Sequence, residues 1–452
     1  MSGRLHAGDH LPPTRVLADE LGLSRWVITE AYDQLKAEGY LSARVGSGTV
    51  VAGPSNPPVV IEEPGRPGLA GPADAGARPL DLSPSLPDVS SFPRAAWRAA
   101  LTRALAGVSD AALAYPAPAG APLLRASMAA YLRRVRGLEV DAERVHVTQG
   151  VGNAVGLVCR ALRARGARRI AVEDPSWPRL RDMARSSGLD VVPVPVDAGG
   201  MQVERLGRLG VDAAFVTPTH QFPTGVPLTA ARRLALIDWA SGRDPSGGSG
   251  GSGGGFGGGG RVIIEDDYDA EFRYDRRPVG ALAARAPGCV VYLGSTSKTL
   301  SPGVHLGWMV APAGLADVLA AARSAVGGMA PTLDQLALVH LIESGAYDRH
   351  LRRMRRVYQQ RRSAVLAALA AAAVPGAPAA SMDAGLHVLW LLPDGADEAR
   401  VLARARERGL AVLGLSQCRV GPGAPGLVLG YGNVSEHRAP SVAAAIAAAC
   451  AG

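Results

Sequence analysis

The sequence predicts an α/β protein with a large, mostly parallel sheet and helices on both sheet faces, preceded by a small winged helix-turn-helix. Two observations predict this. From Leu80 onward, short β-branched runs such as RVHVTQG, RVIIEDDYD and CVVYLGSTSK alternate with longer stretches of helical periodicity, which is typical of parallel sheets covered by helices. Residues 1–52 instead hold two short helical patterns and then two strand-like runs. Residues 80–452 have the length of a large α/β domain with a smaller C-terminal lobe.

Length and composition indicate a soluble protein of two or three domains. The chain has 452 residues, of which 47% are hydrophobic and 19% charged, so it can bury a large core. It holds no run of about 18 apolar residues that could span a membrane, and its N-terminus MSGRLHAGDH has no apolar signal core. The four cysteines, Cys159, Cys289, Cys418 and Cys450, form no C-x-x-C pair, which argues against a zinc site and a disulfide framework. We therefore expect a reduced, cytoplasmic protein without a metal site.

Residues 1–52 have the pattern of a winged helix-turn-helix. Apolar residues recur at helical spacing in TRVLADEL, 14–21, and Gly22 follows as a stop signal. Ser24 has the position of an N-cap for a second helix over 25–38. The stretch LSARVGSGTVVA, 41–52, predicts a hairpin around its GSG sequence. This order of elements indicates a DNA-binding module; a small helical subdomain without DNA contact is the alternative.

Two segments are predicted to lie outside regular structure. Residues 53–79 are rich in Pro, Gly and Ala and show little periodicity, which is typical of an extended linker. Residues 241–260, SGRDPSGGSGGSGGGFGGGG, interrupt the α/β pattern before the strand RVIIEDD. Such a tract cannot bury enough apolar surface to order itself, so it is predicted to be a flexible surface insertion. We accordingly expect one domain over 1–52 and another over 80–452.

Lys298 is the most informative residue of the sequence. The chain carries 48 lysines and arginines and a formal net charge of +8, but its only lysines are Lys36 and Lys298. The surplus of basic residues lies in 160–169 and 349–362 and not in 1–52, so this charge says little about partners. Lys298 follows directly on the predicted strand CVVYLG, and open α/β sheets bind ligands at the carboxyl ends of their strands. Its amine, unlike a guanidinium, can lose its proton and form a Schiff base, which indicates pyridoxal phosphate as the cofactor.

The other groups that a pyridoxal phosphate site needs also follow predicted strands. The ring nitrogen needs a carboxylate, which Asp266 or Asp267 of IIEDDYD could supply. Trp177 of EDPSWP could stack on the ring, and Tyr268 could reach its phenolic oxygen. Backbone N–H groups for the phosphate are expected where Gly150 begins a helix in HVTQGVGNAVGL. Their shared placement after successive strands favours one common site.

Together these motifs resemble a known family along nearly the whole chain. The diagnostic segments include LPPTRVLADELGLSR, YDQLKAEGY, EDPSWP, TPTHQFPTG, IIEDDYDAEFRYD, YLGSTSKTLSPG and HLRRMRRVY. The large domain resembles fold-type I aminotransferases, and the whole chain is similar to the MocR subfamily of GntR-type regulators. The resemblance implies a homodimeric transcriptional regulator that joins a winged helix-turn-helix to an aminotransferase-like domain binding pyridoxal phosphate.

The resemblance also implies the residues of the site. Lys298 would carry the cofactor as an internal aldimine, and Asp266 would pair with the ring nitrogen, with Asp267 left open as the alternative. The resemblance places Tyr268, Gln221 and Trp177 near the ring. It places Gly150, Val151 and Ser295 near the phosphate. It places Tyr115 in the phosphate site of the neighbouring subunit.

Two departures from the family bear on chemistry. His305 stands where relatives usually have an arginine that binds the cofactor phosphate. Histidine cannot make a bidentate phosphate contact, so we expect weaker cofactor binding. Val428 stands where aminotransferases carry the arginine that clamps the substrate carboxylate. Without that clamp the substrate loses affinity and orientation, which disfavours efficient transamination.

In the winged module, the resemblance divides DNA contacts by chemistry. The groups expected near phosphates are Arg15, Ser24, Gly46 and Gly48, and those expected near bases are Arg25, Trp26 and Thr29. Relatives usually have small polar residues where Trp26 stands, so the sequence preference should differ. Relatives also carry a further helix ahead of SGRL, so the module is expected to lack its first helix.

Three functions are compatible with these residues. The first is a transcription factor with pyridoxal phosphate as its effector, governing genes of cofactor or amino-acid metabolism, with an amino acid left open as a second effector. The second is an active aminotransferase with a vestigial DNA-binding module, which the Lys298–Asp266 pair supports and which Val428 and His305 disfavour. The third is a decayed protein that binds neither ligand well.

Overall fold

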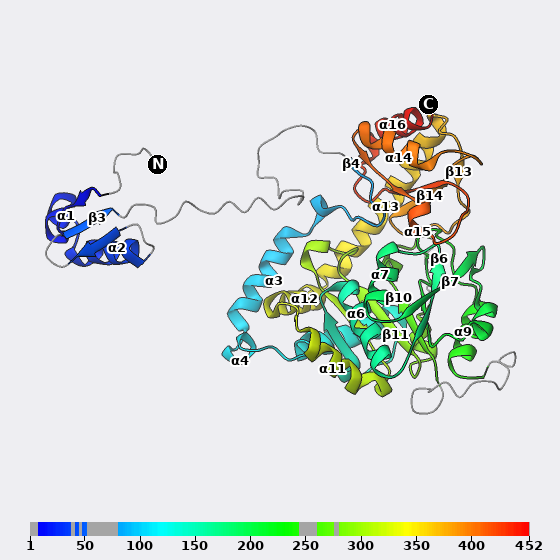
Figure 1. Cartoon of the computed structure of the whole chain (residues 1–452), viewed down its shortest axis with the longest axis horizontal. Helices are drawn as coiled ribbons and strands as arrows, with labels where there is room; N and C mark the ends of the chain where they lie inside the picture. Colours follow the sequence, from blue (N-terminus) through cyan, green and yellow to red (C-terminus); the bar gives the residue numbers. More distant parts are fainter. Residues whose placement is uncertain are drawn as a thin grey trace. The chain divides into compact units, whose positions relative to one another are not determined.

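The computed structural model describes residues 8–37, 41–44, 48–51, 80–243, 260–274 and 280–451. The chain divides into two units, Met1–Ala75 and Gly76–Gly452, each of which is described by itself (Figure 1). The linker predicted over 53–79, Gly46 and most of the insertion predicted over 241–260 lie outside the described residues.

In the first unit, two helices accompany a small antiparallel sheet. Helix α1 (Thr14–Leu21) ends at a glycine in the left-handed region, and α2 (Arg25–Ala37) follows after a short turn. Strands β2 (Leu41–Arg44) and β3 (Gly48–Val51) pair antiparallel as the predicted hairpin. Strand β1 (His10–Leu11), which was not predicted, adds to the other edge of β3. Two residues are too few to show the alternation by which a strand is recognised.

The core of this unit is small. It consists of Ala18, Ile28, Tyr32 and Leu41. Ile28 and Tyr32 lie one helical turn apart, so one face of α2 is buried while Trp26, 71% exposed, lies outside the core. The Tyr32 hydroxyl donates a hydrogen bond to the Pro12 carbonyl oxygen at 3.0 Å and so ties α2 to the turn before α1.

The second unit is built on an eight-stranded sheet. Its strands lie in the order β5-β12-β11-β10-β9-β6-β7-β8. Strand β12 runs antiparallel to both neighbours and β8 antiparallel to β7, whereas all other pairs are parallel, which agrees with the mostly parallel sheet that was predicted. The strands are β5 (Val145–Thr148), β6 (Arg169–Asp174), β7 (Asp190–Asp197), β8 (Gly200–Met201), β9 (Ala213–Val216), β10 (Val262–Asp266), β11 (Val290–Ser295) and β12 (Gly307–Val310).

Helices cover both faces of this sheet, as the alternating pattern predicted (Figure 1). Neighbouring residues of β10 belong to different cores, Ile263 to one and Ile264 to the other, because successive strand side chains point to opposite faces. The core around Ile264 contains residues of α6 (Gly150–Ala164), α7 (Pro178–Ser186) and α11 (Ala316–Val326). The core around Ile263 contains residues of α5 (Pro122–Arg136), α8 (Leu206–Leu209), α9 (Ala230–Ala240), α10 (Leu282–Arg285), α12 (Thr332–Glu343) and α13 (Ala346–Ala371).

A smaller C-terminal lobe follows α13. Its four-stranded antiparallel sheet has the order β13-β14-β17-β16. The elements of the lobe are β13 (Ala377–Pro378), β14 (His387–Leu391), α14 (Glu398–Glu407), β15 (Leu410–Ala411), β16 (Leu413–Gly414), α15 (Leu415–Cys418), β17 (Gly426–Gly430) and α16 (Ala439–Cys450).

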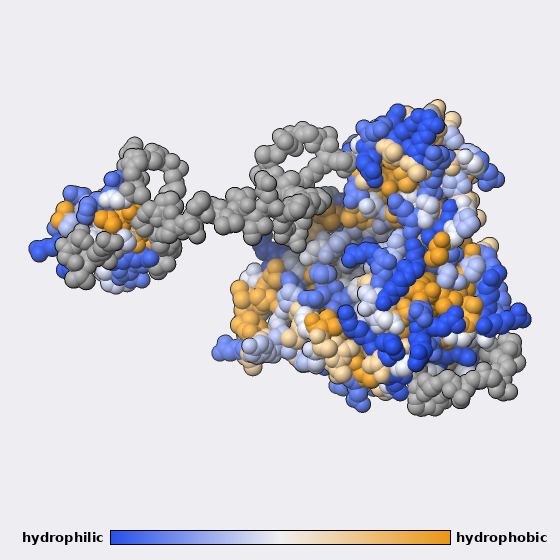
Figure 2. All heavy atoms as spheres, viewed as in Figure 1, coloured by the Kyte–Doolittle hydropathy of each residue, from blue (hydrophilic) through white to orange (hydrophobic). Residues whose placement is uncertain are grey.

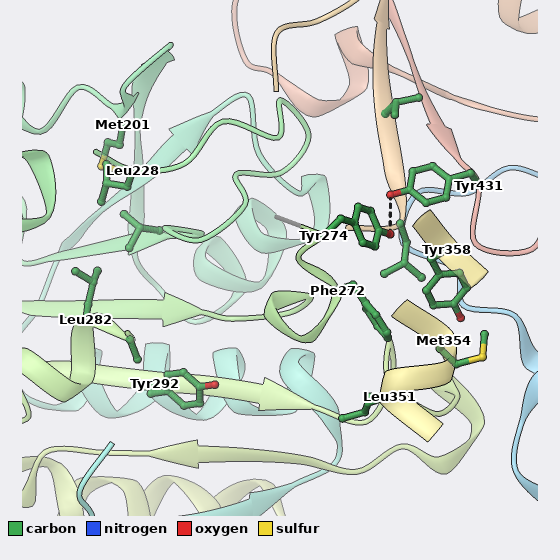
Figure 3. Close-up of a cluster of buried hydrophobic side chains, with 14 of the residues drawn as sticks. Met201, Leu228, Phe272, Tyr274, Leu282, Tyr292, Leu351, Met354, Tyr358 and Tyr431 are labelled. Carbon is green, nitrogen blue, oxygen red and sulfur yellow. Dashed lines mark hydrogen bonds between the residues drawn. The ribbon is translucent and has the colours of Figure 1, made fainter. Parts of the chain in front are cut away.

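One continuous core joins this lobe to the sheet (Figure 3). Phe272, in the one-turn helix η4 (Ala270–Phe272) after β10, packs edge-on against Tyr358 of α13, with ring centroids 5.0 Å apart. Next to them, the hydroxyls of Tyr274 and Tyr431 lie 3.2 Å apart. Tyr431 follows β17, so the lobe and the sheet share buried contacts along α13.

The second unit begins with a short strand that is bonded to the C-terminal lobe. Strand β4 (Leu80–Asp81) pairs parallel with β15 (Leu410–Ala411). Gly430 N–H donates to the Leu82 carbonyl oxygen at 2.8 Å, and Asn433 Nδ2 donates to that of Asp81 at 2.6 Å. Helices α3 (Arg94–Gly107) and α4 (Asp110–Leu113) come next. Across the described ranges, no helix is both long and apolar enough to cross a membrane.

Candidate functional site

A cavity of about 1020 Å³ lies at the carboxyl ends of the parallel strands. Its walls include residues at or just after the ends of β5, β6, β9, β10 and β11, where ligands bind in open α/β sheets. Most of the predicted cofactor residues line it, namely Gly150, Val151, Trp177, Asp266, Tyr268, Ser295, Lys298 and His305. Gln221 and Tyr115 do not line it. Within the described residues, no group of three or more His, Cys, Asp or Glu side chains could hold a metal ion.

The Lys298 amine lies in a poorly hydrated part of this cavity. Burial lowers the pKa of Lys298 below its usual value, although the charges of Asp266 and Asp269 act in the opposite direction. More of the amine is therefore unprotonated at neutral pH than in an exposed lysine, as a nucleophile that attacks a carbonyl carbon requires.

The two adjacent aspartates that the sequence left open have different environments. Asp267 is held by the Arg136 guanidinium, whose Nε lies 2.7 Å from Asp267 Oδ2, and by the Tyr292 hydroxyl at 2.7 Å. Asp266 lines the cavity, and its buried Oδ1 has no hydrogen-bond partner among the described residues. Burial, together with the neighbouring charges of Asp267 and Asp269, raises the pKa of Asp266 to about 8. Of these two aspartates, it is therefore Asp266 that offers a free acceptor to a ligand in the cavity.

The start of α6, directly after β5, forms part of the cavity wall. Gly150 begins α6 with a φ of 75° and lines the cavity with Val151, and the first turn of a helix has backbone N–H groups without partners in the helix. The His305 ring lies against this turn, because a Cβ placed on Gly150 would be 3.4 Å from His305 Cδ2. The hydroxyl-bearing residues Ser295 and Ser297 line the same cavity. Helix N–H groups, hydroxyls and one imidazole are a donor set that suits a phosphate.

Trp177 and Tyr268 supply aromatic walls. Trp177 immediately precedes α7 and packs against the core beneath α6 and against a second apolar cluster around Phe222. Burial raises the pKa of the Tyr268 phenol well above its usual value, and the charges of Asp269 and Asp266 add to this effect. The phenol therefore stays protonated and can donate a hydrogen bond.

Glu173 is a cavity residue that the sequence reasoning missed. It lies in the quoted EDPSWP motif, at the end of β6, and is 2% exposed. Its Oε2 accepts hydrogen bonds from the Thr217 hydroxyl at 2.6 Å and from Gln221 Nε2 at 3.2 Å. The Gln221 amide also bonds Pro175, Phe222 and Thr224, so Gln221 orients Glu173 from behind the wall. Arg179, Ser297 and Ser85 were likewise missed, although Arg179 and Ser297 lie within two residues of Trp177 and Lys298.

Glu173 is expected to make the stability of the unliganded protein depend on pH. Burial raises the pKa of Glu173 from 4.5 to about 7. The folded state therefore keeps a proton that the unfolded state loses, and the free energy of unfolding falls as pH rises from about 4.5 to 7, by roughly 3 kcal/mol from this group. Glu173→Gln should flatten that part of the profile in urea unfolding at stepped pH. Glu407→Gln, on an exposed position of α14, is the control; an unchanged slope in Glu173→Gln would contradict the assignment.

The position of the missing substrate arginine is apolar. Val428 is fully buried in β17, in a cluster with Phe222, Leu389, Leu415 and Cys418. This cluster offers no charge to a substrate carboxylate.

The predicted DNA-contacting side chains of the first unit are mostly exposed. Arg15 is exposed at the start of α1, and Ser24, Arg25 and Trp26 are exposed where α2 begins. Ser24 Oγ accepts a hydrogen bond from Val27 N–H at 3.4 Å, as an N-cap does. The Thr29 hydroxyl donates to the Arg25 carbonyl oxygen at 2.9 Å, so it is engaged within its own helix. Gly48, with a φ of 84°, begins β3 at the hairpin.

Comparison with known proteins identifies both units. Residues 1–51 match the bacterial regulatory proteins of the gntR family, and residues 80–215 match aminotransferase class I and II. The chain is 36% identical to the HTH-type pyridoxine biosynthesis transcriptional regulator PdxR of Corynebacterium glutamicum, over 96% of this chain and 89% of that protein. It is 31% identical to the probable rhizopine catabolism regulatory protein MocR of Rhizobium meliloti, over 96% and 88%.

Solved structures agree with this result for the second unit. Kynurenine aminotransferase of Pyrococcus horikoshii superposes with a TM-score of 0.72 at 25% identity, over 83% of this chain and 91% of that one. These similarities confirm the fold-type I aminotransferase-like fold and the resemblance found in the sequence. The chain therefore belongs to the MocR-type GntR transcriptional regulators, in which a helix-turn-helix domain is joined to an aminotransferase-like domain.

Proposed function

We propose that this regulator binds pyridoxal phosphate in the cavity, attached at Lys298, and that cofactor occupancy controls how its helix-turn-helix binds promoter half-sites in the cytoplasm. One observation carries the proposal: the Lys298 amine and the unpartnered Asp266 carboxylate oxygen line the same cavity. The name of the Corynebacterium glutamicum relative, a pyridoxine biosynthesis regulator, supports genes of cofactor metabolism as targets, with genes of amino-acid metabolism as the alternative.

Different residues of the cavity would bind different parts of the cofactor. Pyridoxal phosphate supplies an aldehyde that condenses with an amine, and Lys298 is the amine in reach. Asp266 would form an ion pair with the protonated ring nitrogen, Trp177 would cover the ring and Tyr268 would donate to the phenolic oxygen. The phosphate would be bound by the N–H groups of Gly150 and Val151 and the side chains of Ser295 and His305.

A titration of the full chain with pyridoxal phosphate tests the proposal. We expect a saturable visible absorption band that borohydride reduction converts into a stable adduct. Because the chain has only Lys36 and Lys298 as lysines, peptide mass spectrometry can assign the adduct without ambiguity. Modification of Lys298 alone supports the proposal. Equal modification of both lysines, or no saturable band, would refute it.

His305→Arg is expected to tighten cofactor binding about tenfold, because arginine can bind the phosphate with two hydrogen bonds and a permanent charge. His305 lies against the first turn of α6, where the added guanidinium would face the same anion. Titration of both proteins at one pH measures the change. His437→Arg, which adds the same charge at an exposed position of the C-terminal lobe, should change nothing. Equal tightening in both variants would show a general effect of charge.

Homodimerisation is part of the proposal. Tyr115 is 97% exposed, and Leu105 and Leu113 are 61% and 54% exposed. Figure 2 shows apolar surface around α3 and α4. A neighbouring subunit would cover this surface, and Tyr115 would reach that subunit's phosphate site. Sedimentation of the full chain at twice its mass would support this; a monomer at all concentrations would oppose it.

Two arginine variants should separate phosphate contacts from base contacts. Arg15→Ala is expected to weaken binding about equally on selected and on random duplexes, because phosphates carry no sequence information. Arg25→Ala should weaken binding only on sequences selected from a random duplex pool by the parent protein, by about 1–3 kcal/mol. Fluorescence anisotropy at fixed salt measures both. Identical profiles for the two variants would refute the division.

Transamination remains the second candidate function, because the Lys298–Asp266 pair that binds the cofactor would also serve it. The apolar cluster around Val428 disfavours it, since a substrate carboxylate would find no charged partner there.

A further inference from the structure

A buried hydrogen-bonded cluster lies directly behind Tyr268. His220 Nδ1 is 2.8 Å from Asp269 Oδ2 and 3.1 Å from the Tyr268 hydroxyl oxygen. The His220 and Asp269 side chains are each 2% exposed. Neither residue lines the cavity, whereas Tyr268 does. The cluster therefore adjoins the candidate site through Tyr268.

Two glycines hold the imidazole of His220 in position. A Cβ on Gly385 would lie 2.4 Å from His220 Cε1, and one on Gly225 would lie 3.0 Å from Nε2. Both glycines have a positive φ, 78° and 74°, so a larger residue would be strained as well as crowded. The Gly385 carbonyl oxygen accepts hydrogen bonds from Tyr274 and Tyr431, each 2.6 Å long, and Figure 3 shows these two tyrosines together. The backbone thus fixes the ring from two sides.

Donor and acceptor roles follow from the chemistry of the groups. An ionised carboxylate only accepts hydrogen bonds, so the His220 Nδ1 that faces Asp269 carries a hydrogen. The Tyr268 oxygen lies close enough to share this N–H. Burial, the charge of Asp269 and a hydrogen bond to the Asp269 carboxylate keep the phenol protonated in the unliganded protein. A phenol that receives an N–H on its oxygen is a stronger donor on its other side, because hydrogen bonds in a chain polarise one another.

The other ionisable groups near His220 and Tyr268 have hydrogen-bond partners of their own or line the cavity. The His387 ring lies 5.3 Å from it, and burial lowers the pKa of His387 well below its usual value. His387 contacts the Ser85 hydroxyl and the Pro223 carbonyl oxygen instead. The other carboxyl groups that act on Tyr268 are Asp266 and Glu173, which line the cavity.

We propose that His220 and Asp269 are positioning residues that hold Tyr268 as a hydrogen-bond donor toward an anionic oxygen of the bound ligand. This inference rests on the proposed function, under which that oxygen is the phenolic oxygen of pyridoxal phosphate. A donor at this oxygen stabilises its full negative charge and so favours the deprotonated form of the complex. Weakening the donor should therefore raise the pH midpoint at which the Lys298-dependent absorption band changes.

The test is a pH titration of that band in the full chain loaded with pyridoxal phosphate. Tyr268→Phe should raise the midpoint by about one pH unit, a tenfold change in proton affinity. His220→Phe, which has no N–H, should raise it in the same direction by less, and should cause no further rise in the Tyr268→Phe background. His220→Gln retains an N–H and should restore the midpoint. His387→Phe removes the buried imidazole next to His220 and should leave the midpoint unchanged.

The outcomes separate this inference from the proposed function. Equal shifts by His220→Phe with and without the Tyr268 hydroxyl would overturn the inference while the band itself persists. If the parent protein shows no Lys298-dependent band, the proposed function fails and the inference fails with it. His220→Leu serves the same comparison if His220→Phe does not fold. Asp269→Asn is a poorer probe, because the charge of Asp269 also raises the pKa of Lys298.

Discussion

Replacing Lys298 by alanine is expected to abolish the visible band and the borohydride-stable adduct completely. The chain has one other amine side chain, Lys36. Lys36 lies on α2 in the first unit, where its Nζ is 3.0 Å from Asp33 Oδ1. Lys36 does not line the cavity, so no side-chain amine remains to attack the aldehyde there. Absorption and intact mass after reduction measure the loss.

The matched control is Lys36→Ala, which should keep the full band and a single adduct. Residual noncovalent binding by Lys298→Ala, detected by equilibrium dialysis, is still expected, because the ring and phosphate contacts remain. A band of parental intensity in Lys298→Ala would place the reactive amine elsewhere and overturn the assignment.

Substitutions of the adjacent aspartates Asp266 and Asp267 are expected to affect different properties, cofactor affinity in one case and stability in the other. Asp266→Asn should weaken cofactor binding by roughly 10- to 100-fold, because a charged hydrogen bond to the ring nitrogen is lost. Its cost in stability should be small, since Asp266 Oδ1 has no partner to lose. Asp267→Asn should instead destabilise the fold by about 3–5 kcal/mol, because it leaves the buried Arg136 charge uncompensated.

Each aspartate variant is the control of the other. Cofactor titration and urea unfolding are measured for both variants. Asp266→Asn should lose cofactor affinity and keep its stability, whereas Asp267→Asn should lose stability. If Asp267→Asn loses affinity and keeps its stability, the ring nitrogen lies against Asp267 and the assignment is wrong.

The fold could be predicted from the sequence because its signal is spread over many residues. Alternating runs from Leu80 onward predicted the sheet, and the comparisons bear out the fold class. Strand β1 was missed because two residues carry no periodicity. The placement of Lys298, Asp266 and Trp177 around one cavity also followed from the sequence, since each stands just after a strand.

The sequence could not show which side chains contact one another when they lie far apart in the chain. Asp266 and Asp267 are adjacent, and only the approach of Arg136 from α5 distinguishes them. Gln221 was expected near the ring oxygen, yet its amide is used by Glu173, Pro175 and Phe222. No periodicity or spacing encodes where a side-chain amide will find its partners, because those partners come from other loops.

The short strand at the start of the second unit has a mechanical consequence. Ser83, Pro84 and Ser85 line the cavity, and only Leu82 separates them from β4, which is bonded to β15 of the C-terminal lobe. This part of the cavity wall is therefore connected through a very short segment to the hydrogen-bonded pair of β4 and β15. A displacement of this wall by a ligand would therefore move β4, whose first residue, Leu80, is where the described part of the second unit begins.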